Sequence, residues 1–216
     1  MIKHSELARA LIDKFGNGEP VHQILVLTSG GVEAEAGNQA SDESAMKASP
    51  EKWPDTVDNS GFVFGNASKG AMLGVHPTLI QVATLALRYT KQDFRFYEGG
   101  RSVAQQRINV QKGVSKTMDS KHLKQVSGYY EAMDLVPIIS GIPKWDWNGC
   151  YLIAVAVDRA ATELGVANHI RWGGVWDRTL DKISGGADSY ASAVHEYAER
   201  HPGKDFLDGP HFEYKP

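Results

Sequence analysis

Apolar residues recur along the chain with the spacing of helices in some segments and of strands in others. A helical spacing follows His76-Pro77 and runs strongly from Cys150 to Gly165. Residues 102–112, which Gly113 would end, and Asp188–Arg200 are also expected to be helical. The chain is thus predicted to contain four helices in this part, and the strongly periodic ones have an apolar face that must pack against another element.

Short segments of strand length and strand composition lie between the predicted helices. They are Asp93–Glu98, Ala132–Ile139, Ile170–Trp172 and Pro210–Tyr214. Helices and strands follow one another without the regular βαβ order of a doubly wound parallel sheet, and we find no internal repeat. The pattern therefore favours an α+β fold.

The first 61 residues differ from the remainder. Ser5 can cap an amphipathic helix, and His22–Thr28 has the composition of a short strand. From Ser29 to Gly61 the chain is rich in small and acidic residues and poor in apolar ones. About 60 residues of this kind cannot easily bury a core of their own. We expect residues 1–61 to be an N-terminal appendage and linker of undefined function, and residues 62–216 to be the main domain.

Charge and composition exclude several classes of function. The chain has 216 residues, 42% of them hydrophobic, and a formal net charge of -3. Residues 1–61 hold 5 Lys/Arg against 10 Asp/Glu, and the rest holds 18 against 16. Neither part carries the strong basic field of a nucleic-acid-binding protein, so we expect no nucleic-acid partner.

Cysteine and hydropathy patterns restrict the protein further. The single cysteine, Cys150, excludes an intrachain disulfide and a four-thiolate zinc site, and we expect it to be a small buried hydrophobe. No apolar run of about 18 residues is present, so we expect no membrane insertion. The N-terminus lacks the apolar stretch of a secretory signal, which predicts accumulation in the cytoplasm of the producing cell.

Three short segments carry side chains suited to metal binding and proton transfer. They contain His122, Asp134 within an apolar strand, and Asp208 with His211. A carboxylate in an apolar strand needs a partner, and zinc bound by two histidines and one carboxylate supplies one while leaving a position for water. Asp208 could then move a proton. From these residues alone, hydrogen-bonded core histidines and a simple turn at Asp208 are the alternatives.

Five motifs follow one another in order over about 150 residues. They are Leu73–Leu79 (LGVHPTL), Glu98–Gln106 (EGGRSVAQQ) with Gly113–Thr117, Ser120-x-His122 with Ala132-x-Asp134, Trp172–Trp176, and Asp208–Glu213 (DGPHFE). With these motifs, residues 62–216 resemble the zinc metallopeptidase family of D-Ala-D-Ala carboxypeptidases and phage L-alanyl-D-glutamate endopeptidases, and most of all its endolysin branch. The resemblance implies a small antiparallel sheet flanked by helices, the hedgehog-like fold of the D-Ala-D-Ala metallopeptidases.

The resemblance also implies a role for each matched position. The implied ligands of one Zn²⁺ ion are His122, Asp134 and His211, the implied catalytic residues are Asp208 and Arg101, and the implied substrate-binding residues are Arg101, Gln106 and Ser120. Asp208 would act as general base and then as general acid. Arg101 would stabilise the charge that develops on the scissile carbonyl group. Trp172 and Trp176 are expected to pack or to line the site.

The sequence departs from the family pattern in two places. Eleven residues, 123–133, separate His122 from Asp134, where the compact family form has about six, and Gly128 is expected to make the turn within them. A long insertion, roughly Lys182 to Leu207, contains His195 and His201. These histidines are six residues apart, or about 240° around a helix, so they cannot share a metal. We expect a solvated helix there that rims the substrate groove.

Taken with the resemblance, the sequence predicts a peptidoglycan peptidase that cleaves the L-Ala–D-Glu bond of stem peptides. Cleavage as a D,D-carboxypeptidase is the alternative within the same class. A catalytically silent virion or cell-wall-binding protein is the alternative of another class, and the presence of Asp208, Arg101 and all three ligands disfavours it. We expect a monomer held in the host cytoplasm until its release to the cell wall, with delivery on a particle as the alternative.

Overall fold

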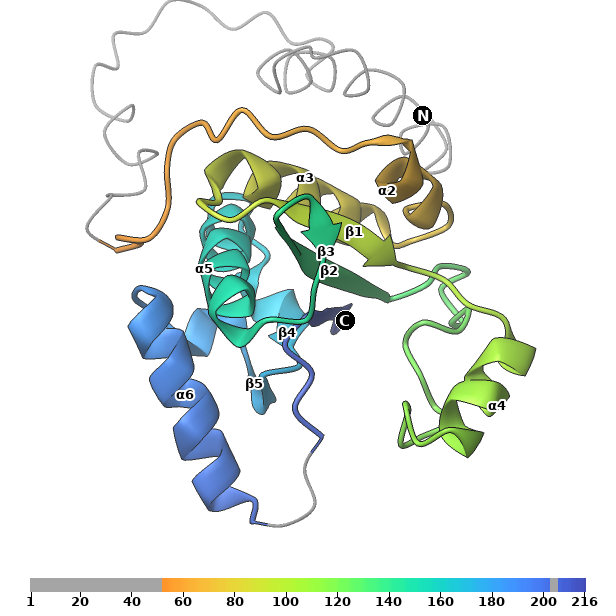
Figure 1. The fold of residues 1–216 in the computed structure, drawn as a ribbon. Coiled ribbons are helices and arrows are strands. Elements are labelled where there is room, and N and C mark those ends of the chain that lie inside the picture. The colour runs from red at the N-terminus through yellow and green to blue at the C-terminus, as the bar shows by residue number, and fades with distance from the viewer. Residues whose placement is uncertain (1–51, 203–205) are drawn as a thin grey trace, which may run out of the picture. The chain divides into compact units, whose positions relative to one another are not determined.

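The computed structural model describes residues 52–202 and 206–216, which are built around one antiparallel sheet (Figure 1). Its strands are β1 (Phe94–Glu98), β2 (Ala132–Ile139), β3 (Ile142–Pro143), β4 (Ile170–Trp172), β5 (Val175–Thr179) and β6 (His211–Tyr214). Their order across the sheet is β1-β2-β6-β4-β5, and β3 pairs with β2. The last strand, β6, therefore lies in the centre of the sheet, between β2 and β4.

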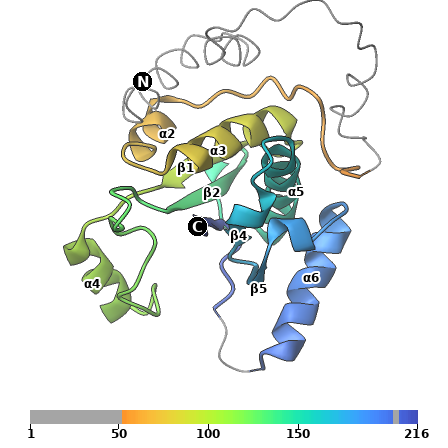
Figure 2. The ribbon, with the colours of Figure 1, turned by 180° about the vertical axis from the view of Figure 1, so that it is seen from behind.

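Helices cover this sheet and extend beyond it. They are α2 (Asn66–Ala71), α3 (Pro77–Tyr89), α4 (Val103–Gln111), α5 (Trp147–Glu163) and α6 (Ala187–Arg200), with short 3-10 helices η3 (Ala167–His169) and η4 (Leu180–Lys182). Helices α3 and α5 pack against each other and against the sheet, and α6 packs on α5. Helix α4 stands apart from the sheet, as both faces of the molecule show (Figures 1 and 2).

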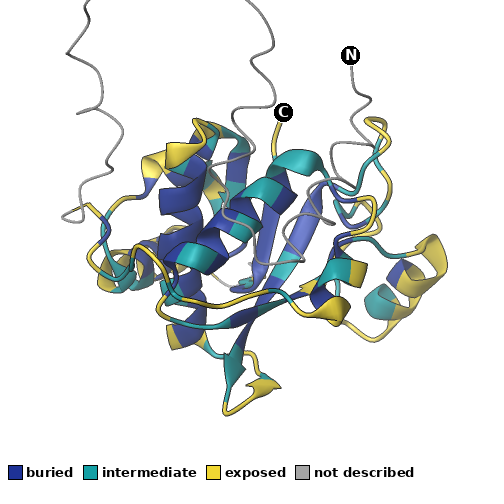
Figure 3. Ribbon diagram, turned by 90° about the horizontal axis from the view of Figure 1, so that it is seen from above, coloured by how far each residue is buried: buried dark blue, intermediate teal, exposed yellow. Residues whose placement is uncertain are grey.

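Local sequence signals explain why the two central helices form. Helix α3 begins with Pro77 in its first turn, and Asp146 caps α5 by accepting a hydrogen bond from the Gly149 amide. The apolar face of α3, including Leu79 and Val82, is fully buried. Figure 3 shows the buried residues concentrated where these helices meet the sheet. Helix α4 buries only Gln106, so no apolar packing holds it.

The predicted α+β class, with a small antiparallel sheet flanked by helices, is confirmed. Strand β2 has the predicted bounds, and Cys150 is buried as expected. The helix and strand expected near Ser5 and over His22–Thr28 lie outside the described residues. Within those described, no helix has the length and apolarity needed to cross a membrane.

Residues 52–61, which the sequence assigned to the appendage, pack against the body of the protein. Trp53 is buried, and its indole Nε1 donates to Asp158 on α5 over 2.8 Å. Arg159, also on α5, donates to Thr56 Oγ1 over 2.9 Å and to Asp58 Oδ1 over 2.6 Å. The compact unit that contains the sheet begins at Ser49. The structure therefore groups these residues with the body, and the boundary predicted after Gly61 falls within a packed segment.

The predicted helix in the long insertion is α6, but it is only partly solvated. Tyr190, Ala193, Val194 and Tyr197 are buried on the face that packs against α5. Its other face is exposed and carries His195, which pairs with Glu199. Since the apolar residues recur at helical spacing, one face of α6 belongs to the core.

Candidate metal centre and active site

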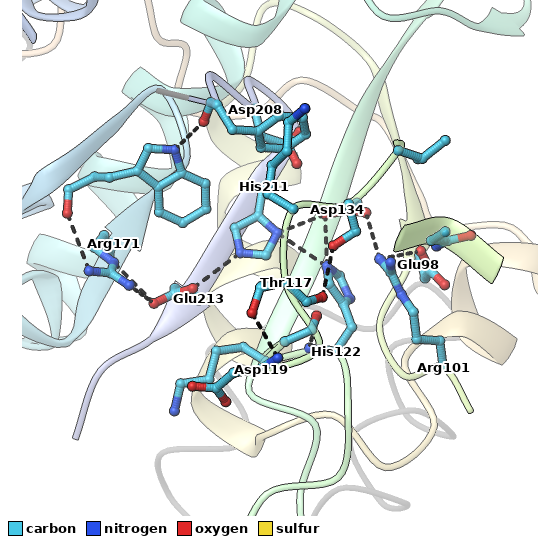
Figure 4. Close-up of a pocket in the computed structure, with 18 of the residues that line it drawn as sticks. Glu98, Arg101, Thr117, Asp119, His122, Asp134, Arg171, Asp208, His211 and Glu213 are labelled. Atoms are coloured by element: carbon cyan, nitrogen blue, oxygen red, sulfur yellow. Dashed lines mark hydrogen bonds and ion pairs between the residues drawn. The ribbon is translucent and has the colours of Figure 1, made fainter. Parts of the chain in front are cut away.

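The three residues expected to bind metal lie together at the centre of the sheet (Figure 4). Strands β2 and β6 pair so that Asp134 stands opposite His211, and His122 comes from the turn that precedes β2. Asp134 Oδ1 lies 3.1 Å from His122 Nε2 and 3.2 Å from His211 Nδ1. The two imidazole nitrogens are 3.1 Å apart. The fold thus brings together residues 89 positions apart in sequence.

Hydrogen-bond partners on the outer side of each ring fix its orientation. His122 Nδ1 lies 2.7 Å from the Gly99 carbonyl oxygen, and His211 Nε2 lies 3.3 Å from Glu213 Oε2. Because a carbonyl or carboxylate oxygen only accepts, we infer that these outer nitrogens carry the protons. The inner nitrogens, His122 Nε2 and His211 Nδ1, then direct their lone pairs at the common centre.

This donor set fits a zinc ion. Zinc binds imidazole nitrogen and carboxylate oxygen at about 2.0–2.2 Å, so tetrahedral ligand atoms lie roughly 3.3 Å from one another. The observed separations among His122, Asp134 and His211 are 3.1–3.2 Å. Three protein ligands leave a fourth position for water or substrate, which is the pattern of catalytic zinc sites.

The electrostatics of the ligands agree with cation binding. Burial raises the pKa of Asp134, but the His122 and His211 side chains more than offset burial and hold that pKa well below its usual value. Burial lowers the pKa of His211, yet hydrogen bonds to Asp134 and Glu213 raise it to about 10. The metal-free centre therefore attracts a proton to His211, and metal binding is expected to release it.

The ligands open into a groove of about 700 Å³. Arg101, Ser120 and Asp208, all expected at the active site, line the same groove. Asp208 is partly buried, and burial together with the neighbouring Asp134 carboxylate raises the pKa of Asp208. A carboxyl group in this position can accept a proton and return it, as a general base and acid must.

Backbone contacts around Gly173 set the positions of Asp208 and His211. The Asp208 amide donates to the Gly173 carbonyl over 2.9 Å, and the Gly173 amide donates to the His211 carbonyl over 2.8 Å. A Cβ atom on Gly173 would lie 2.4 Å from the Asp208 carbonyl oxygen, so only glycine allows this approach. Trp172 is buried and donates to Gly209, as expected of a packing residue, and Trp176 lines the groove.

Arg101 lies at the edge of the metal centre. Its Nη2 is 2.7 Å from Glu98 Oε2 and 3.9 Å from Asp134 Oδ2, and its Nη1 donates to Gln106 Oε1 over 3.1 Å. Its backbone amide donates to the His122 carbonyl over 2.9 Å. The guanidinium group is thus fixed on several sides and faces the groove (Figure 4).

Gln106 and Ser120 differ in their relation to the groove. Gln106 is fully buried, and its Nε2 donates to Ser115 Oγ over 2.8 Å and to the Thr117 carbonyl over 2.6 Å. This geometry is that of a residue that positions Arg101 and the loop after α4, and it differs from the substrate contact expected from the sequence. Ser120 does line the groove, and its Oγ accepts from the His122 amide over 3.3 Å.

The additional residues between His122 and Asp134 fold back on themselves. Lys124 and Tyr130 form an antiparallel bridge, and the Gly128 amide donates to the Gln125 carbonyl over 2.9 Å. Gly128 has a φ of 86°, a backbone conformation that favours glycine, so the turn forms where the sequence predicted it. The extra residues therefore form a local turn and leave both ligands in place.

Sequence reasoning assigned no role to Glu213 or Arg171. Arg171 on β4 donates to Glu213 Oε1 from Nε over 3.0 Å and from Nη2 over 2.5 Å, while Glu213 Oε2 faces His211. The spacing of His211 and Glu213 could have revealed the role of Glu213, because alternate residues of a strand share a face. Arg171 could not be found in this way, since its contact depends on the pairing of β4 with β6.

The chain is similar to known peptidases. Residues 60–214 match the family described as phage L-alanyl-D-glutamate peptidase. The chain is 34% identical over 123 residues to the L-alanyl-D-glutamate peptidase of Escherichia phage T5, a match that covers 56% of this chain and 85% of that protein. It also resembles the crystal structure of the Serratia marcescens L-Ala D-Glu endopeptidase ChiX, with a TM-score of 0.50 and 36% identity over 70% of this chain and 89% of that one.

Proposed function

Because this chain belongs to the phage L-alanyl-D-glutamate peptidase family, we propose that it hydrolyses the L-Ala–D-Glu bond in peptidoglycan stem peptides and depends on zinc. The observation that carries the zinc dependence is the convergence of three ligand atoms from His122, Asp134 and His211. They face a groove that also contains Asp208 and Arg101. A site that only binds cell wall has no need of a proton-transferring carboxylate next to a metal.

Zinc held by these three residues would supply Lewis acidity, which polarises a carbonyl group and makes water more acidic. Asp208 is the residue of the groove suited to the accompanying proton transfers. Its carboxylate accepts a proton from the attacking water and passes it to the amine nitrogen of D-glutamate as the amide bond breaks. Its place in the groove beside the three ligands favours this use.

Arg101 is proposed to act on the scissile carbonyl group. Negative charge develops on that oxygen as water adds, and a guanidinium group already fixed in the groove stabilises it without reorganisation. Glu98 and Gln106 hold the guanidinium in place through contacts of 2.7 and 3.1 Å. Removal of either contact is expected to weaken this stabilisation without removing a ligand.

The similar proteins favour this bond over the D-Ala-D-Ala bond of carboxypeptidases. The phage T5 relative and ChiX, both more than 30% identical to this chain, are each named for the bond between L-alanine and D-glutamate. The three ligands, Asp208 and Arg101 would serve either reaction, since hydrolysis of both bonds needs the same chemistry. The preference therefore rests on the relatives.

Mass spectrometry of purified peptidoglycan digested by this protein tests the proposal. We expect fragments with a new N-terminal D-glutamate, their loss when a zinc chelator is present, and their return when zinc is added. Release of D-alanine instead would identify a carboxypeptidase. The absence of any cleavage by zinc-loaded protein would contradict the enzymatic proposal and favour a binding role.

A further inference from the structure

Two exposed aromatic rings stand at the rim of the groove. Tyr97 on β1 is 43% exposed, and Trp145, between β3 and α5, is 56% exposed. Their ring centroids are 5.1 Å apart in an edge-to-face arrangement, and both residues line the groove. We name this pair the aromatic shelf. Because both rings line the groove, they offer apolar surface and polar edges to a ligand bound there.

Tyr97 stands at an irregularity in β1, on the face opposite the buried Phe94 and Phe96. Phe96 pairs with Leu135 and Glu98 pairs with Asp134, so Tyr97 is an extra residue in the strand. Such bulges redirect side chains and are frequent beside active sites. Phe96 is fully buried in the core. Glu98 pairs with Asp134, so Tyr97 adjoins the residue of β1 that stands opposite this ligand.

The polar group of Trp145 is free for a ligand. The indole nitrogens of Trp53, Trp172 and Trp176 each donate a hydrogen bond within the protein. Among the described residues neither Trp145 Nε1 nor Trp147 Nε1 has a hydrogen-bond partner, and of these two only Trp145 lines the groove. Trp145 therefore offers both an apolar ring face and an unused N–H donor, a combination common in aromatic residues that bind ligands.

The chemistry of the substrate suggests what this surface binds. In peptidoglycan, the amino group of the stem L-alanine is joined to the lactyl group of an amino sugar of the glycan strand. One residue spans about 3.3–3.6 Å, so this sugar ring follows closely on the scissile bond. A sugar ring has an apolar C–H face that stacks on aromatic rings, and its hydroxyl and acetamido groups accept hydrogen bonds from an indole N–H.

Lysine side chains line the groove from a different segment of the chain. Lys116 and Lys121 come from the residues that follow α4. We assign to them the carboxylates on the D-glutamate side of the bond. Tyr97 and Trp145 carry no charge and suit a neutral sugar.

We propose that the aromatic shelf binds the amino-sugar ring that carries the stem peptide, an inference that rests on the proposed function. The enzyme is thereby specific for stems still attached to glycan. The test compares kcat/KM for two soluble substrates with the same L-Ala–D-Glu bond. One is a disaccharide-linked stem peptide, and the other has an acetyl group in place of the sugar.

We expect the wild-type protein to prefer the sugar-linked substrate by about tenfold, which corresponds to roughly 1.4 kcal/mol. Trp145→Ala should reduce this ratio to near one, mainly through KM for the sugar-linked substrate. Ile142→Ala is the matched control, because Ile142 is an exposed apolar residue of the adjacent β3 that does not line the groove. It should leave the ratio unchanged. Thermal unfolding verifies that both variants fold.

An unchanged ratio in Trp145→Ala, or no preference in the wild-type protein, would overturn the proposal. A second measurement separates it from the proposed function. The peptide-free disaccharide should change the tryptophan fluorescence of the wild-type protein and not that of Trp145→Ala. If neither peptide is cleaved, the proposed function is wrong. The disaccharide titration still tests the aromatic shelf, because the absence of binding would exclude a sugar-binding site there.

Discussion

At the scale of single residues, the metal centre depends on the groups that hold the imidazole rings. Glu213 faces His211 Nε2, and Arg171 fixes Glu213 through two hydrogen bonds. Partners of this kind orient a ligand and increase its basicity, so they influence metal affinity without touching the metal. Glu213 is therefore a positioning residue for His211.

Replacement of Glu213 by glutamine tests this role. Because glutamine keeps the shape and loses the charge, Glu213→Gln should weaken zinc affinity by roughly 10–100-fold. Competition with a chromophoric chelator measures the affinity directly. Glu131→Gln is the matched control, since Glu131 is a buried carboxylate that pairs with Lys121 and is not a partner of His122 or His211. Equal affinities in both variants would contradict the assignment.

Asp208 offers a second test, because its proposed role is in catalysis rather than in metal binding. Asp208→Asn should keep the fold and a full complement of zinc, and should lower kcat by about 10²–10⁴-fold, the usual contribution of a general acid-base group. Steady-state kinetics on a soluble disaccharide-linked peptide, with metal analysis of the same sample, gives both quantities. A variant that turns over at the normal rate would remove Asp208 from the mechanism.

The candidate ligands could be predicted from sequence because their short motifs resemble those of a known family, whereas the residue types alone left alternatives open. His122, Asp134, His211 and Asp208 each stand in a motif of a few positions. The contacts of Arg171 could not be predicted, since they depend on strand register. The burial of Gln106 was also missed, because α4 otherwise has no apolar face from which burial could be inferred.

At the scale of elements, strongly periodic segments were predicted well and weakly patterned ones were not. Strands β2 and β4 have the predicted bounds, and α5 and α6 start within three residues of the predicted positions. The six-residue α2 (NASKGA) has no apolar stripe, and β3 has two residues, so neither produces a periodic signal. Strand β5 follows a glycine pair that was interpreted only as a turn.

Helix α5 carries a buried carboxyl group with an expected effect on stability. Burial raises the pKa of Asp158 to about 6, although the hydrogen bond from Trp53 opposes this shift. The neutral form is thus favoured in the folded state. The stabilisation by the neutral Asp158 carboxyl group is fully present below pH ~3.9, the pKa of an aspartate in the unfolded chain. It is lost as the pH rises through 6, the pKa in the folded state.

Asp158→Asn should therefore stabilise the protein above pH 7. Asparagine stays neutral and still accepts from the Trp53 indole, so the free energy of unfolding at pH 7.5 should rise by roughly 1–3 kcal/mol. At pH 4 the two proteins should differ little. Urea unfolding at both pH values measures the difference. An equal or lower stability of the variant at pH 7.5 would show that the buried carboxylate does not destabilise the folded state.

The contacts of residues 52–61 predict the result of two truncations. Removal of residues 1–48 should leave the melting temperature nearly unchanged, because the compact unit begins at Ser49. Removal of residues 1–60 takes away the buried Trp53 and the partners of Arg159. The free energy of unfolding should fall by roughly 3–5 kcal/mol, the usual effect of removing a buried tryptophan side chain. Similar stability of both products would place the boundary at Gly61 after all.

At the scale of the whole molecule, the fold serves to bring distant segments to one place. The central position of β6 lets the C-terminal motif supply His211 and Asp208 next to Asp134 on β2. The segment after β1 contributes Arg101, and the turn before β2 contributes His122. The strand order could not be derived from periodicity alone. The resemblance to a known family predicted a small antiparallel sheet flanked by helices, without the order of its strands.

The central claim, that zinc bound by His122, Asp134 and His211 enables peptide hydrolysis, is tested most directly by reconstitution. Zinc would be titrated into chelator-treated protein while bound metal and hydrolysis of a disaccharide-linked stem peptide are measured in the same sample. Activity should rise in proportion to bound zinc and level off at one ion per chain, and His211→Ala should neither retain the ion nor recover activity. Full activity in the metal-free protein would contradict the claim.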